Sequence, residues 1–161
     1  MTIRPIASAA DLATVRQLFA EYASSLETDL SFQDFDTELA SLPGAYVPPW
    51  GALLVAEVAG QLVGCVALRP LELPVVAEIK RLYVRPAGRG QRLGLALSRA
   101  ILERARVAGY RRVRLDTLPT MLAAQALYRD LGFREIPPYR HNPVPGTRFM
   151  ELDLTVPPGA A

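Results

Sequence analysis

The stretch VRPAGRGQRLGLAL, residues 84–97, is the part of this sequence that decides its fold. A strand-like run over residues 78–84 stops at Pro86, and two arginines, two glycines and a glutamine follow within residues 89–94. An apolar pattern at helical spacing then predicts a helix over residues 91–108. A glycine-rich turn between a strand and a helix exposes backbone N–H groups at the positive end of the helix dipole. The stretch therefore predicts a phosphate-binding site.

Three kinds of phosphate-binding loop can occupy such a position. A nucleotide P-loop needs G-x-x-x-x-G-K-[ST], and neither the lysine nor the Ser/Thr is present here. A dinucleotide fingerprint needs G-x-G-x-x-G, and Gly88 and Gly90 supply only its first half because position 93 is leucine. The third kind is the pyrophosphate loop of coenzyme A-binding enzymes. On the loop alone, a plain turn with solvated arginines is a further alternative.

Length and composition indicate one soluble domain. The chain has 161 residues, of which 50% are hydrophobic, and its single cysteine, Cys65, excludes an internal disulfide. No apolar run approaches the roughly 20 residues that a membrane span needs, and the N-terminal residues lack a signal-peptide pattern, so we expect a cytoplasmic protein. Residues 1–79 carry a net charge of −7 and residues 80–161 one of +9. The basic half favours a polyanion or a small phosphorylated ligand.

The hydrophobic spacing predicts a mixed α/β domain around one sheet. Ser31 and Asp34 have capping-box spacing at the start of a helix. The predicted order is a strand at 3–6, helices at 9–24 and 31–41, a hairpin at 53–58 and 61–68, the strand at 78–84, the helix at 91–108, a strand at 112–115, a helix at 123–131, and strands at 133–136 and 149–154.

Two blocks of residues resemble the GNAT superfamily of acetyl-coenzyme A-dependent N-acyltransferases. Its signature, [QR]-x-x-G-x-[GA], opens a long helix directly after a strand, and residues 89–94 (RGQRLG) match it at Arg89 and Gly94. They depart from it at Arg92, where the family usually has glycine. The family pattern A-x-x-x-Y-x-x-x-G-F follows at residues 124–133 (AQALYRDLGF).

The resemblance implies a single N-acetyltransferase domain over residues 1–161, with a cofactor-binding core at 53–154 and a variable acceptor side at 1–50. It implies a mostly antiparallel sheet, flanked by helices, that splays between the strand at 78–84 and the next one. It implies acetyl-coenzyme A as co-substrate and no metal. The implied cofactor-binding residues are Leu82, Tyr83, Val84, Arg89, Gly90, Gln91, Arg92, Leu93, Gly94, Ala124 and Tyr128.

The resemblance also implies two catalytic residues. Tyr128 matches the tyrosine that often serves as general acid toward the leaving thiolate, and simple packing of its ring on the sheet is the alternative. Glu78 lies eleven residues before Arg89, where some members of the family carry a catalytic glutamate. An ion pair of Glu78 with Lys80 or an arginine is its alternative, and ordered water can then serve as base.

The acceptor site is predicted from position. Phe32 and Gln33, in the segment before the core, and Arg140 and His141, in the proline-rich loop, are the candidate contacts. Five acidic residues crowd the same early segment and would attract a cationic amine, although they can also form a solvated helix face: Glu27, Asp29, Asp34, Asp36 and Glu38. Cys65 lies in an apolar strand and is expected to be a core thiol rather than a covalent nucleophile.

The sequence therefore predicts an N-acetyltransferase that acts on a primary amine of a small molecule or peptide by direct transfer. A non-catalytic acyl-coenzyme A sensor is the first alternative. A nucleic-acid-binding module is the second, although no base-stacking aromatic motif accompanies the arginines. Homodimers are common in the resembled family, so a homodimer stays an open alternative, although nothing in the sequence marks an interface.

Overall fold

The computed structural model describes residues 1–26, 29–30 and 34–157. Its described elements form one seven-stranded sheet in the order β1-β2-β3-β4-β5-β7-β6. The elements are β1 (Thr2–Pro5), α1 (Ala9–Ser25), α2 (Phe35–Ser41), β2 (Ala52–Val58), β3 (Gln61–Glu72), β4 (Val76–Val84), a 3₁₀ turn (Pro86–Gly88), α3 (Leu93–Ala108), β5 (Arg112–Thr117), α4 (Leu122–Asp130), β6 (Arg134–Ile136) and β7 (Arg148–Asp153).

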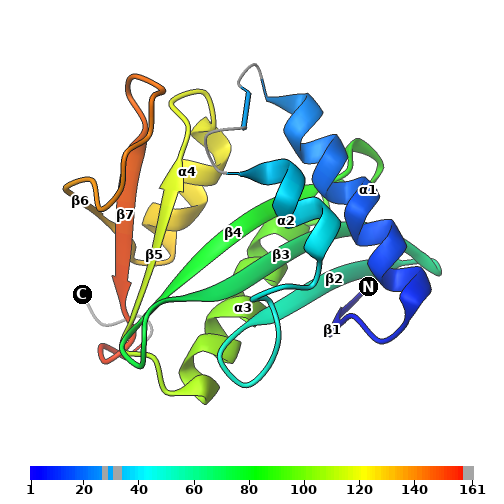
Figure 1. The fold of residues 1–161 in the computed structure, drawn as a ribbon, viewed down its shortest axis with the longest axis horizontal. Coiled ribbons are helices and arrows are strands. Elements are labelled where there is room, and N and C mark those ends of the chain that lie inside the picture. Colours follow the sequence, from blue (N-terminus) through cyan, green and yellow to red (C-terminus); the bar gives the residue numbers. More distant parts are fainter. Residues whose placement is uncertain (27–28, 31–33, 158–161) are drawn as a thin grey trace.

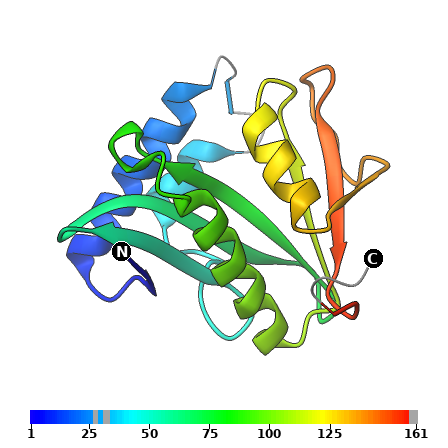
Figure 2. The same ribbon diagram turned by 180° about the vertical axis from the view of Figure 1, so that it is seen from behind.

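Helices cover both faces of the sheet, which confirms the predicted mixed α/β fold. Helices α1 and α2 lie over one face (Figure 1), and α3 and α4 lie over the other, as the reverse view shows (Figure 2). The α1/α2 face has a buried cluster that includes Phe19, Phe35 and Val55, and the α3/α4 face has a larger one that includes Leu97 and Met150. Among the described helices, none is long and apolar enough to cross a membrane.

The sheet splays between β4 and β5, as predicted. All neighbouring strands pair antiparallel except these two, which are parallel and share only three residue pairs, from Val76↔Arg112 to Glu78↔Arg114. Beyond Glu78 the two strands diverge, as Figure 1 shows. The β5-facing edge of β4 from Ile79 onward is therefore outside the ladder.

Several predicted element boundaries need correction: β4 begins two residues earlier than predicted, β5 ends two residues later, and β1, β6 and β7 are shifted by one residue at one or both ends. Strand β3 extends four residues past the predicted end, because its pairing with β4 continues to Glu72. Helix α2 begins at Phe35 after Asp34 in the left-handed region, and Ser31, its predicted cap, lies outside the described residues. Helix α3 begins at Leu93 and not at residue 91, because Arg92 before it has φ of 58°. Helix α4 ends at Asp130, one residue earlier than predicted.

Candidate active site

A cavity of about 50 Å³ lies where β4 and β5 diverge. Three residues predicted from the family motifs line it, namely Leu82 of β4 and Ala124 and Tyr128 of α4. Three charged residues line it as well: Lys80, Arg81 and Asp116. The cavity thus joins motif residues that lie more than forty positions apart in the sequence.

A β-bulge in β4 shapes one wall of the cavity. Cys65 pairs with Tyr83 and Ala67 with Lys80, so β4 contains one more residue than β3 across this interval. Arg81 lies at this point with φ of 60°, which is unusual for a residue with a side chain. A bulge leaves its extra residue unpaired and re-aims neighbouring side chains. Here it brings Lys80, Arg81 and Leu82 to the cavity in succession.

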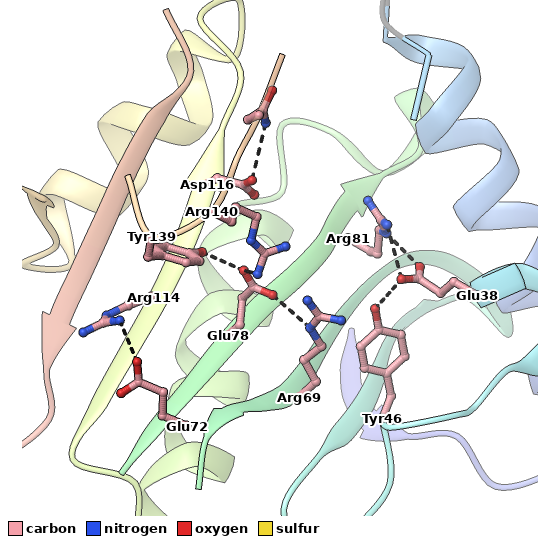
Figure 3. Close-up of polar contacts among 11 residues, drawn as sticks. Glu38, Tyr46, Arg69, Glu72, Glu78, Arg81, Arg114, Asp116, Tyr139 and Arg140 are labelled. Carbon is pink, nitrogen blue, oxygen red and sulfur yellow. Dashed lines mark hydrogen bonds and ion pairs between the residues drawn. The ribbon is translucent and has the colours of Figure 1, made fainter. Parts of the chain in front are cut away.

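Glu78 is a buried ionic centre at the point where the splay begins. Its side chain is fully buried, and its Oε1 accepts a hydrogen bond of 2.9 Å from Nε of Arg69. Its Oε2 accepts one of 2.6 Å from the Tyr139 hydroxyl and a further one from Arg140. Figure 3 shows Arg69 and Arg140 on either side of this carboxylate. Burial alone would raise the pKa of Glu78, but its cationic neighbours and Tyr139 together hold that pKa below its usual value.

Lys80 is the buried amine of the cavity. It is 6% exposed, and burial lowers its pKa to about 8, with Glu78 acting in the opposite direction and Arg81 adding to the lowering. A lysine with such a pKa exchanges protons near neutral pH, unlike a solvated lysine. Asp116, on the facing strand, favours the charged form.

Arg81 forms a bidentate ion pair that links the sheet to α2. Its Nε and one terminal nitrogen donate to the two Glu38 oxygens at 2.8 and 3.2 Å. Glu38 also accepts a 2.8 Å hydrogen bond from the Tyr46 hydroxyl. The Arg81 guanidinium lies 5.1 Å from the centre of the Phe35 ring, so it also contacts the start of α2. Glu38 thus faces Arg81 and is not available to a cationic acceptor.

Tyr128 projects from α4 and is 6% exposed. Its ring packs against Phe133 at a centroid distance of 5.5 Å. Burial raises the pKa of the phenol, and the charges of Tyr22 and Asp116 raise it further, so the hydroxyl keeps its proton at neutral pH. Within the described part of the chain, no hydrogen-bond partner for this hydroxyl is present. The Tyr128 side chain packs on the core, as the packing alternative predicts. It also lines the cavity, as the general-acid role requires.

The glycine-rich loop leads from β4 to an open helix end. Ala96 N–H makes the first hydrogen bond of α3, to the Arg92 carbonyl at 3.1 Å, so the three preceding N–H groups have no partner within the helix. Arg92 has no side-chain capping bond, and the first turn of α3 has no acidic residue. A Cβ atom on Gly90 would meet nothing within 4 Å. These features leave the positive end of the helix dipole accessible.

The other predicted residues are placed as follows. Tyr83 lies in the α1/α2-side cluster, and Val84 packs on the opposite face. Phe32 and Gln33 lie outside the described residues. His141 is exposed.

Cys65 is fully buried, which confirms a core thiol, and burial raises its pKa. Within residues 1–26, 29–30 and 34–157, no cluster of His, Cys, Asp or Glu is arranged to hold a metal.

The sequence motifs missed the charged residues of the site. Lys80 and Asp116 line the cavity, and Arg69 reaches Glu78 from β3, yet none of them belongs to a motif. The available signal was a cluster of three charged residues, Glu78, Lys80 and Arg81, inside an apolar strand, since buried charges usually have partners or functions.

The comparisons with known proteins decide the family. The model of the acetyltransferase (GNAT) family matches residues 12–133. The chain belongs to this family. An uncharacterized N-acetyltransferase of Schizosaccharomyces pombe is 42% identical over 146 residues, which are 90% of each protein. The N-acetylaspartate synthetase of Danio rerio is 34% identical over 83% of this chain, and the match covers 49% of that protein.

A solved structure supports the same fold. The GNAT chain superposes on a putative acetyltransferase from Salmonella typhimurium, solved with its cofactor acetyl-CoA, with a TM-score of 0.71 at 23% identity. The match covers 96% of this chain and 94% of the other. The family match and the 42% identical relative confirm the resemblance inferred from two short motifs, and this GNAT protein is an acyltransferase by family.

Proposed function

We propose that this protein transfers an acetyl group from acetyl-coenzyme A to a primary amine in a single direct step. The observation that carries the proposal is the cavity at the β4–β5 splay, where Leu82, Ala124 and Tyr128 meet. The same strand continues into the loop that ends at the open N-terminus of α3. One end of the site therefore suits a thioester and the other a diphosphate.

The residues of the loop fit a coenzyme A diphosphate. The N–H groups of Leu93, Gly94 and residue 95 have no partner within the helix, and the helix dipole favours an anion there. At Gly94 a Cβ atom would meet only Leu127, at 3.7 Å, so this glycine leaves the backbone open to a close ligand. Arg92 and Arg89 would add charge-assisted contacts. Residues 82–84 would hold the pantetheine arm along the unpaired edge of β4.

Tyr128 would act as the general acid. The nitrogen of the acceptor bonds to the acetyl carbon, the carbon–sulfur bond breaks, and the sulfur takes a proton from the phenol. Burial raises the pKa of Tyr128, so the phenol is protonated when the thiolate forms and can donate a hydrogen bond to it, although the same shift makes it a weaker acid. Backbone N–H groups at the Arg81 bulge, near Leu82 or Tyr83, would stabilise the developing oxyanion.

Two groups are candidates to take the proton from the amine. Glu78 was predicted from its position, but both of its oxygens already accept hydrogen bonds, and its lowered pKa makes it a weak base. Lys80 lines the cavity itself, and its pKa of about 8 gives it a neutral fraction at mildly alkaline pH. We therefore assign the base role to Lys80 and an electrostatic role to Glu78. A cytoplasmic location and a homodimer stay predictions.

The decisive experiment measures thiol release from acetyl-coenzyme A with a panel of amines, for wild type and Tyr128→Phe. We expect amine-dependent thiol release by wild type and a fall in kcat of about 100-fold or more in the variant. A thermal melt reports cofactor binding separately. A cofactor concentration about 100 times Kd adds roughly 2.7 kcal/mol, or very roughly 5–10 °C, in both proteins.

Each alternative predicts a different outcome. A melting shift without thiol release on any amine would leave a sensor. No shift with acetyl-coenzyme A would overturn the cofactor assignment, and salt-dependent binding to DNA or RNA would then test the arginine-rich half.

A further inference from the structure

Positive charge gathers around Glu78, which stands two residues before Lys80 of the cavity wall. Arg69 from β3, Lys80 from β4 and Arg140 from the loop before β7 all act on the single carboxylate of Glu78. Tyr139 adds a neutral donor to the same carboxylate. Three cations thus share one buried anion, and Figure 3 shows the two arginines converging on it from different elements.

The two arginines have donors to spare. A guanidinium carries five N–H donors in a planar fork. Arg69 uses its Nε on Glu78, and Arg140 uses one terminal nitrogen. Neither makes another hydrogen bond or ion pair with the described residues. Their side chains are 33% and 22% exposed, so the remaining donors are within reach of a ligand.

Two further carboxylates lie nearby, and they offset this charge only in part. Glu38 is bonded to Arg81 and Tyr46. Asp116 lines the cavity and favours the charged forms of Lys80 and Arg140, and among the described residues it accepts one long hydrogen bond of 3.5 Å, from Asn142. A fully cationic acceptor would have to approach Arg69 and Arg140, whereas an anion would accept hydrogen bonds from their remaining donors.

We infer that the acceptor amine also carries a carboxylate, which Arg69 and Arg140 bind, as in a free α-amino acid. This inference rests on the proposed function and names its substrate class. The carboxylate would lie on the exposed donors beside Glu78, and the amine would extend toward Lys80 and Asp116 in the cavity. Arginine forks suit a carboxylate because they form two parallel hydrogen bonds to it. The cationic acceptor expected from the acidic N-terminal segment gives way to an amine with a negative group.

The first test compares acids with their amides on the wild-type protein. L-Alanine is assayed against L-alanine amide, L-aspartate against L-asparagine, and spermidine serves as the cationic acceptor. We expect at least one acid to have a kcat/KM about 10–100 times that of its amide, since a hydrogen bond to a charged group contributes more than one to a neutral group. Equal or better use of the amides or of spermidine would overturn the inference while leaving the acetyltransferase function intact. Absence of turnover with every amine would instead overturn the proposed function.

The second test removes the proposed contacts. In Arg69→Gln and Arg140→Gln we expect the KM of the best acid to rise about 10–100-fold, while the KM of its amide and the melting shift with acetyl-coenzyme A stay within about twofold. Arg106→Gln is the matched control, because it removes an equal charge from the far end of α3, where Arg106 pairs with Glu103. Equal losses for acid and amide would show that the arginines only maintain the fold, and the inference would fail.

Discussion

At the scale of single residues, the cavity depends on a lysine that no motif marks. Lys80 is buried beside Arg81 and lies under the influence of Glu78 and Asp116, so its pKa reflects a balance between burial and charge. General bases work best when their pKa lies near the working pH. A buried lysine between two carboxylates meets this condition without a histidine, and the single histidine, His141, is exposed.

The role of Lys80 predicts the pH dependence of the reaction. The neutral amine is the active form, so kcat should rise with pH and level off above an apparent pKa of about 8. Lys80→Arg keeps the charge but cannot lose a proton. We expect it to lower kcat about 100-fold or more with little change in the Kd of acetyl-coenzyme A. A Lys80→Arg enzyme with full kcat and an unchanged pH profile would show that only the charge matters. Lys80→Met, assayed over the same pH range, serves as the second variant if arginine does not fit.

Some of these residues could be predicted from the sequence, and others could not. Tyr128 and Gly94 could be found because they stand at fixed spacings within continuous motifs. Arg69 could not be found, because its meaning depends on the register that places it opposite Glu78 on the neighbouring strand. Glu78 was predicted from its position in the strand, yet the sequence could not show that three donors occupy its oxygens.

At the scale of elements, the N-terminus of α3 is the point where the helix begins and where its unpaired backbone N–H groups are accessible to a ligand. The left-handed Arg92 stops the helix from starting earlier, which is why the apolar pattern alone predicted the wrong start. Glycine adopts this conformation without the cost that a side chain adds, roughly 1 kcal/mol, so the family preference for glycine at this position has a physical reason. The bulge at Arg81 could not be predicted either, because the periodicity of a strand sequence does not show that one strand has an extra residue relative to its neighbour.

Gly94→Ala should separate stability from cofactor binding. Gly94 lies in the first turn of α3 with room for a methyl group, so alanine should raise the free energy of unfolding by about 0.5 kcal/mol. The same methyl group should obstruct a diphosphate on the backbone amides and raise the Kd of acetyl-coenzyme A at least about tenfold, equivalent to about 1.4 kcal/mol. Denaturant unfolding and calorimetric titration measure the two effects. Gly90→Ala is the comparison, since φ of 82° makes alanine unfavourable there and stability should fall. If Gly94→Ala binds the cofactor normally, the diphosphate does not approach that glycine.

At the scale of the whole molecule, the two faces of the sheet connect its halves differently. On the α3/α4 face, one apolar cluster includes residues of β2–β4 and residues of β5 and β7. On the α1/α2 face, the apolar cluster of the described residues includes none from β5–β7. There, the polar contacts of Glu78 with Tyr139 and Arg140 join the halves across the splay. On the α1/α2 face, an ionic centre thus joins the two halves of the sheet. On the α3/α4 face, the apolar core joins them.

Glu78→Gln should therefore weaken the link between the halves. It leaves Lys80 and two arginines without their shared anion, and removing one partner of a buried ion pair costs about 3 kcal/mol. Hydrogen exchange should accelerate most at the amides of β5 and β7. Glu72→Gln is the matched control, because Glu72 is 62% exposed and pairs with Arg114 at 3.5 Å, so it should cost less than about 0.5 kcal/mol.

The pH dependence of this difference gives a sharper test. The folded-state pKa of Glu78 is below its unfolded value of about 4.3. Its stabilisation is therefore complete above about pH 5 and is lost as the pH falls through the folded pKa. Wild type and Glu78→Gln should differ most near neutral pH and converge in acid, as measured by urea unfolding across the range. A difference that stays constant down to pH values where Glu78 is protonated would show that shape rather than charge holds the halves together.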